Sequence, residues 1–271
     1  MSAAVLVAAL GFLWFSFRYA WWRPAADANR PRLLMYHMIS APRAGARFNG
    51  LRVTPDRFAR QLRWLHDQGW HSFTVSELVE LGERLPPRSF AITFDDGYAD
   101  NLLHALPLLQ RYRCKATLYL VVERFDRDWS VMRKAHHNDG ELQREPKLTD
   151  EQVETLLASG CVELGSHSLT HANFLRLDTD SARRELAASR EALEARFGVP
   201  VTSFAWPFGL YRDEQVALAA QAGYSSAVTT HEGIESPQRW QPLQLKRIKI
   251  GGRDNWLAFR LRLRGGRRGW R

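Results

Sequence analysis

Short apolar runs alternate along this chain with longer segments in which apolar residues recur every three or four positions. Residues 33–36 and 89–94 form nearly continuous apolar runs, which is typical of buried strands. Between them, Thr54 as an N-cap, Pro55 in the first turn and a single apolar face predict a helix that ends at Gly69. The alternation continues, with strands expected at 116–122, 162–164, 202–206, 224–228 and 243–250, helices at 99–112, after Thr149, at 181–197 and at 213–222, and a last basic helix. This order favours a parallel, barrel-like sheet with functional groups at the carboxyl ends of its strands.

The N-terminus has a different pattern. Residues 3–17 are apolar apart from Ser16 and run into an aromatic and basic border that starts at Arg18. We predict an uncleaved transmembrane anchor over 1–23, which reaches the roughly 20 residues of a bilayer span only if Arg18 snorkels toward the headgroups. A cleaved signal peptide is the alternative, although the segment lacks a basic start and its one small-residue cleavage triplet, 26–28, lies well beyond the apolar run.

The remaining boundaries follow from these two patterns. We expect a linker at 24–32, a catalytic domain at 33–250 and a basic amphipathic tail at 251–271. The long polar segment 123–147 is expected to be a lid or substrate loop, and Trp129 within it either stacks on a sugar or packs. The expected location is a bacterial-type inner cell membrane, crossed once. The face that carries the catalytic domain stays open, because the basic flank predicts the cytoplasm whereas many glycan hydrolases work on the other side.

Charge and cysteine content add little. The 271 residues carry a formal charge of +9, so the surface should attract polyanions. We interpret the basic clusters near both ends as membrane-surface contacts, with a solvated tail as an equal alternative. Nucleic acid is not an expected partner because no motif for it is present. Cys114 and Cys161 are not at a spacing typical of metal ligands, and each begins an apolar, strand-like run. The sequence does not decide whether they form a disulfide.

Three short motifs that each follow an expected strand carry the candidate chemistry. Asp95 and Asp96 end the strand at 89–94, His167 and His171 are four residues apart, and residues 206–209 read Trp-Pro-Phe-Gly. Two imidazoles at this spacing and a carboxylate from another strand can bind one divalent metal and leave positions open for water and a carbonyl. Each motif alone has an ordinary explanation as a turn, a structural histidine pair or core packing, but their coincidence predicts a metal-dependent hydrolase.

Residues 93–97, 167–171 and 205–209 resemble the three motifs of the polysaccharide deacetylase family, also called the NodB-homology or carbohydrate esterase 4 group. The third is the loosest match. The likeness covers about residues 88–250, and Met35-Tyr36-His37 extends it toward the branch of poly-N-acetylglucosamine deacetylases. The resemblance implies an α/β fold with a distorted (β/α) barrel.

It also implies roles for single residues. Asp96, His167 and His171 would hold a divalent metal, usually zinc, and Asp95 would be the general base that activates water. The backbone N–H of Phe208 would help to stabilise the tetrahedral oxyanion.

Two departures from the family pattern matter. No Leu-x-x-His motif supplies a general acid near the C-terminus, so His37, after the first strand, is assigned that role against the alternative of a structural strand-end histidine. The arginine that usually begins the third motif is also absent. We expect Arg247, on a late strand, to pair with Asp95 and keep it ionised. Tyr98, Asn101, Asn173 and Tyr211 are further candidates for the mouth of the barrel, although each also has an ordinary explanation as a polar turn residue. Trp206, like Trp129, either stacks on a sugar or packs.

The expected substrate is an N-acylated, typically N-acetylated, amino sugar of a surface or exported polysaccharide. A lipid-linked or formylated amino sugar is the alternative within enzymes, since the chemistry needs only an amide carbonyl at the metal. A catalytically silent glycan-binding module is the alternative outside enzymes, although both carboxylates and both histidines are retained. The membrane surface is the other expected partner.

Overall fold

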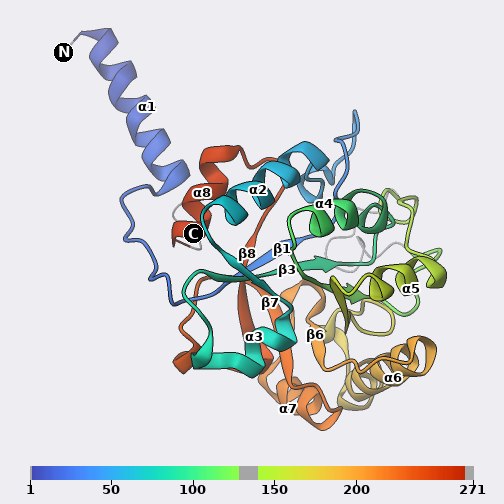
Figure 1. Ribbon diagram of the computed structural model, residues 1–271. Coiled ribbons are helices and arrows are strands. Elements are labelled where there is room, and N and C mark those ends of the chain that lie inside the picture. Colours follow the sequence, from blue (N-terminus) through green and yellow to red (C-terminus); the bar gives the residue numbers. More distant parts are fainter. Residues whose placement is uncertain (1, 128–139, 266–271) are drawn as a thin grey trace.

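The computed structural model describes residues 2–127 and 140–265 and shows a parallel β-barrel surrounded by helices (Figure 1). Seven parallel strands follow one another around the barrel, which is closed by the pairing of the first strand with β3. A short extra strand, β2 (His71–Phe73), pairs with the beginning of β3. The seven strands are β1 (Arg32–Tyr36), β3 (Ser89–Asp95), β4 (Ala116–Leu120), β5 (Val162–Ser166), β6 (Ser203–Ala205), β7 (Ser226–Glu232) and β8 (Leu245–Lys249).

The helices pack around the outside of the barrel (Figure 1). Their starts follow the capping rules that the sequence predicts. The Thr54 hydroxyl accepts the Arg57 N–H at 3.3 Å, and Thr149 forms a reciprocal capping box with Gln152. The helices of the body are α2 (Pro55–Asp67), α3 (Val75–Leu81), α4 (Leu106–Arg111), α5 (Asp150–Ala158), α6 (Thr179–Phe197), α7 (Asp213–Gln221) and α8 (Trp256–Gly265).

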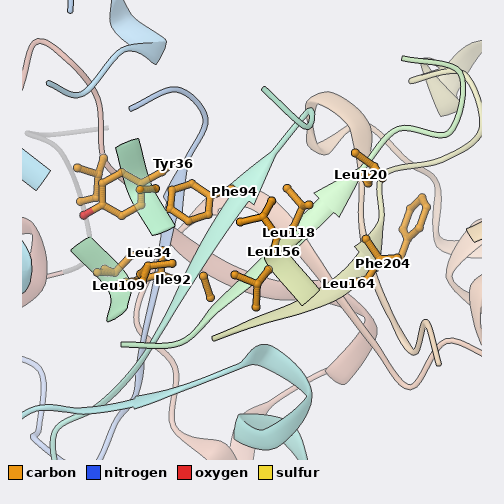
Figure 2. Close-up of a cluster of buried hydrophobic side chains, with 14 of the residues drawn as sticks. Leu34, Tyr36, Ile92, Phe94, Leu109, Leu118, Leu120, Leu156, Leu164 and Phe204 are labelled. Carbon is orange, nitrogen blue, oxygen red and sulfur yellow. The ribbon is translucent and has the colours of Figure 1, made fainter. Parts of the chain in front are cut away.

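Alternation along the strands separates the hydrophobic core from the site. Leu34, Ile92 and Phe94 point out of the barrel and pack beneath the helices (Figure 2). The intervening residues of β3 lie on the inner face, so the same two-residue period that buries Ile92 and Phe94 places Thr93 and Asp95 inside the barrel. Asp95 is therefore buried at the carboxyl end of β3, with 2% of its surface exposed.

Some elements differ from the sequence prediction for local reasons. The helix expected at 99–112 begins as a π-helical turn, Asn101–Ala105, before α4, because Pro107 has no N–H to continue the regular ladder. The strand expected at 224–228 is shifted toward the C-terminus in β7. Neither β2 nor α3 was anticipated from the pattern, since both are short. Both cysteines are free thiols.

The two chain ends compare differently with the expectation: the last basic helix is present, whereas the membrane span is not confirmed. The N-terminal helix, α1 (Ala3–Tyr19), has 17 residues, and Ala20 ends it in a left-handed conformation. No helix in the described part of the chain is both long enough and apolar enough to cross a membrane, so the predicted transmembrane segment is not confirmed. In the predicted tail, α8 buries Phe259 and Leu263 against the body. Residues 128–139 of the expected lid, with Trp129, and residues 266–271 lie outside the described residues.

Candidate metal centre

Asp96, His167 and His171 converge at the carboxyl ends of β3 and β5. The Asp96 Oδ1 atom lies 3.4 Å from His167 Nε2 and 3.3 Å from His171 Nε2, and all three side chains are buried. Two ligand atoms that bind one tetrahedral ion at about 2.0–2.1 Å are separated by about 3.3–3.4 Å. The distances from Asp96 to the two imidazole nitrogens therefore match the spacing that a divalent ion of this size requires, and all three donor atoms lie within 4.8 Å of one another.

Backbone groups orient the two imidazole rings. His167 directly follows β5, and its Nδ1 lies 2.7 Å from the carbonyl oxygen of Ala205, which fixes the proton on Nδ1 and leaves Nε2 as an acceptor. His171 has a left-handed backbone with φ 59°, and its N–H donates to Ser168 Oγ at 2.9 Å. The His171 ring packs edge-on against the Phe208 ring at 4.5 Å between centroids.

A buried carboxylate holds the loop that carries these histidines. Glu185, from α6, accepts the backbone N–H groups of Leu169 and Thr170 at 2.9 and 3.0 Å, and the Thr170 hydroxyl at 2.6 Å. The loop between His167 and His171 is thus tied to α6, the next α-helix along the chain. Nothing local in the sequence identifies Glu185, because it stands among other charged residues of α6.

Burial sets the protonation states of the ligand groups. Burial tends to raise the pKa of Asp96, but its contacts with the His167 and His171 rings outweigh that effect and hold the pKa well below its ordinary value. Burial lowers the pKa of His171 to about 4, and the neighbouring Asp96 offsets this only in part. An ionised carboxylate beside a neutral imidazole is the combination that binds a divalent metal.

The neighbouring carboxylate, Asp95, is held by Arg247 from β8. The two guanidinium nitrogens Nη1 and Nη2 donate to Asp95 Oδ1 and Oδ2, each at 2.7 Å, in a bidentate pair. Arg247 also donates to Thr93 Oγ1 and to the carbonyl oxygen of Thr229, each at 2.8 Å. Burial alone would raise the pKa of Asp95, but the guanidinium outweighs it and the net shift is downward. The arginine missing from the third motif thus has a counterpart on a different strand.

Of three further groups, His37 and Tyr98 lie near the two carboxylates and Phe208 packs against His171. His37 follows β1 on the inner face and is half-buried; burial lowers its pKa, and the charges of Asp96 and Asp95 offset part of that effect. Phe208 stands in a left-handed conformation with φ 58° in the turn Pro207–Gly209. Tyr98 lies close enough to Asp96 for its pKa to be raised by that charge, although burial is the larger cause.

The remaining candidates Trp206, Asn101 and Asn173 have structural roles. Trp206 is fully buried, stacks on Tyr211 and donates its indole N–H to the carbonyl oxygen of Leu243 at 3.0 Å, so it belongs to the core. Asn101 donates to the carbonyl oxygen of His37 at 2.9 Å and braces the strand end. Asn173 accepts the Leu175 N–H at 3.1 Å as a cap.

Known proteins share both the sequence pattern and the fold. The sequence model of the family described as polysaccharide deacetylase matches residues 82–227, which is more than half of the chain. YxkH of Bacillus subtilis, whose name assigns it to the polysaccharide deacetylases, is 30% identical over 243 residues that cover 89% of this chain and 78% of that protein.

This chain belongs to the polysaccharide deacetylase family. A solved polysaccharide deacetylase of Bacillus cereus has a TM-score of 0.72 and 26% identity, covering 87% of this chain and 69% of that one. A Streptococcus pyogenes deacetylase, solved in complex with acetate, has a TM-score of 0.69 and 25% identity, covering 85% and 95%.

A more distant similarity connects the chain to deacetylases of a defined polymer. The poly-β-1,6-N-acetyl-D-glucosamine N-deacetylase of Escherichia coli K12 is 24% identical over 231 residues, covering 74% of this chain. The match spans only 34% of that enzyme.

Proposed function

We propose that this protein hydrolyses the N-acyl amide, typically N-acetyl, of amino sugars in a cell-surface or exported polysaccharide. The observation that carries the proposal is the pairing of two adjacent carboxylates with different partners. Asp96 faces His167 and His171, whereas Asp95 is paired with Arg247. Asp96 is therefore suited to bind a metal, and Asp95 is available to accept a proton.

A divalent ion at Asp96, His167 and His171, with zinc as the expected metal, would supply Lewis-acid chemistry by lowering the pKa of water and polarising the amide carbonyl. Asp95 acts as the general base in this proposal. Because Arg247 keeps its carboxylate ionised, Asp95 is ready to accept the proton that the attacking water loses.

The other half of the reaction needs an oxyanion donor and an acid. In our proposal the Phe208 N–H, set in its left-handed turn, donates to the oxygen that becomes negative as the carbonyl is attacked. His37 carries the proton that the departing sugar amine takes when the C–N bond breaks. Burial lowers the pKa of His37, but its inward position at the end of β1 brings it within reach of the charges of Asp96 and Asp95, which favour the protonated ring and support this assignment.

The substrate class rests on relatives. The chemistry requires only an amide carbonyl at the metal, and the names of the related proteins refer to polysaccharides and to poly-N-acetylglucosamine. Candidate substrates for a first assay are therefore N-acetylglucosamine oligosaccharides, with N-formyl and lipid-linked amino sugars as comparison arms. Release of acetate or formate identifies the acyl group.

Two substitutions separate the proposed base from the proposed metal ligands. Asp95→Asn should retain the ion and lose turnover by about 10²–10⁴-fold, the range associated with general acid–base catalysis. His167→Ala should lose the ion itself. Asp180→Asn, an exposed carboxylate on α6, is the matched control and should change neither property. Acetate release and metal content are measured on the same preparations.

The outcomes distinguish the parts of the proposal. Undiminished turnover in Asp95→Asn would remove Asp95 as the base. Unchanged metal content in His167→Ala would remove the metal centre. A wild-type protein that binds both metal and acetylated glycan without releasing acetate would identify a silent binding module.

A further inference from the structure

A hollow away from the metal centre lies on the flank between α2 and α8, with a volume of about 480 Å³. Its apolar floor includes Trp64, Trp70, Leu257 and Leu261. Arg32 also lines the hollow, and its guanidinium donates hydrogen bonds to backbone carbonyl oxygens, including that of Leu263 at 2.9 Å. The hollow has the size of a small-molecule site but stands apart from the metal centre.

The rim of this hollow is cationic. Arg88, Arg260 and Arg264 line it with exposed side chains, and none of the described residues that line the hollow is acidic. Within the described parts of the chain, these three arginines form no ion pair with a carboxylate. Arg88 donates to the carbonyl oxygen of Gln68 at 2.6 Å, and Arg260 lies over the Trp64 ring at 5.7 Å. An apolar floor with a cationic rim complements an anionic amphiphile.

The exposed helix α1 and the residues after it are attached to α8, which forms one side of the hollow. The Asn255 amide, just before α8, donates to the Tyr19 hydroxyl at 2.9 Å, and Arg264 Nη1 donates to the carbonyl oxygen of Trp21 at 3.4 Å. The Ala26 N–H donates to the Arg264 carbonyl oxygen at 2.7 Å. Figure 1 shows α1 leaving the body beside α8.

No residue of α1 is buried, and most of its large apolar side chains, Leu10, Phe12 and Trp14 among them, are at least half exposed. A water-exposed surface of this kind requires a partner of its own. In an anionic bilayer, the acyl region would cover the apolar side chains of α1, and the lipid phosphates would contact the arginines at the rim of the hollow.

We propose that this flank docks on an anionic lipid surface. The apolar side chains of α1 enter the acyl region, and the hollow takes the headgroup phosphate of one anionic phospholipid on Arg88, Arg260 and Arg264, with the adjoining methylenes over Trp64 and Leu257. Lipid bound there would leave the metal centre uncovered, because Arg32 and His37 stand at opposite ends of β1 and its extension.

Vesicle flotation of the full-length chain tests this docking without any assay of turnover. The chain is diluted from detergent into phosphatidylcholine vesicles with and without phosphatidylglycerol. The wild type should prefer the anionic vesicles. Each arginine near the surface contributes about fivefold, so the triple variant R88Q/R260Q/R264Q should lose roughly a hundredfold of the preference. Binding to neutral vesicles through α1 should persist, and added salt should weaken only the wild-type preference.

A matched variant controls for net charge. R111Q/R176Q/R184Q removes three exposed arginines from outside the hollow and should retain the preference. An equal loss in both triple variants, or no loss in R88Q/R260Q/R264Q, would overturn the proposal.

A second readout places a reporter in the hollow itself. Leu257→Cys, in a chain with Cys161→Ala, carries an environment-sensitive dye whose emission should shift to the blue with anionic vesicles. A dye that remains in water while the protein is bound would exclude lipid from the hollow. This readout does not depend on the folding of the triple variant.

Discussion

Replacing Arg247 with methionine should leave the buried carboxylate of Asp95 without a counter-ion. Arg247 and Asp95 are 1% and 2% exposed, and the guanidinium makes four hydrogen bonds of 2.7–2.8 Å to Asp95, Thr93 and Thr229. Removing one partner of such a pair costs about 3–5 kcal/mol of unfolding free energy. The double variant Arg247→Met with Asp95→Asn has no unpaired buried charge. Its expected loss of unfolding free energy therefore falls to about 1–3 kcal/mol, the cost of leaving buried polar groups without hydrogen bonds.

The loss should depend on pH. In the wild type the pKa of Asp95 is lowered, so its contribution to stability is present above the ordinary value of about 3.9 and is lost as pH falls through the lower folded value. Without Arg247, burial raises the pKa of Asp95 above that value. The folded variant then binds a proton that the unfolded chain does not, and its stability falls as pH rises through this window. The difference from wild type should therefore be small in acid and largest near neutrality.

Urea denaturation with metal chelated measures both effects. The unfolding free energies of wild type, Arg247→Met and the double variant are compared near pH 7 and near pH 4. A loss below about 1 kcal/mol at neutral pH, or a loss that does not shrink in acid, would refute the assignment of this pair as a buried, mutually dependent ion pair.

Further predictions concern the metal and the backbone. Zinc at about a hundred times its dissociation constant should raise the unfolding free energy of the wild type by about 2.7 kcal/mol and that of His167→Ala not at all, as measured by calorimetry; equal gains would exclude the site. Gly209→Ala places a Cβ 2.0 Å from Thr230 Oγ1 at φ +67° and should cost more than about 3 kcal/mol, whereas Gly198→Ala, at φ +64° with open space, should cost about 1–2 kcal/mol; the reverse order in urea unfolding would contradict the packing. Thr74→Ala removes a capping box and should cost about 1 kcal/mol by the same assay, and no change would show that the cap is dispensable.

The alternation of strands and helices made the barrel predictable from the sequence, because each buried strand is a short apolar run between well-capped helices. The position of Asp95 and Asp96 at the carboxyl end of β3 also predicted that acidic groups would stand at the mouth of the barrel. The family resemblance already assigns Asp96 to the metal and Asp95 to the role of base, with Arg247 expected beside it. The geometry that separates them needed the structure, since neighbouring residues at a strand end face different partners only when the chain turns. Asp96 does so in a left-handed conformation with φ 77°.

Long-range support could not be read from the sequence. Glu185 reaches back to the loop between the two histidines, and the Ala205 carbonyl oxygen orients His167 across a strand boundary. Arg247 was expected opposite Asp95 only because the third motif lacks its usual arginine. At the N-terminus, apolar composition alone predicted a membrane span, but the length of a helix is set by where it ends, and α1 ends at Tyr19.

Acetate release during metal titration tests the central claim most directly. Metal-stripped protein is titrated with zinc in the presence of an N-acetylglucosamine oligosaccharide, and acetate is measured at each step. We predict no release without metal and a rise that saturates at one ion per chain. Release that is unaffected by chelation would contradict a reaction centred on Asp96, His167 and His171, as would a stoichiometric loading of zinc that restores no turnover on any N-acylated amino sugar.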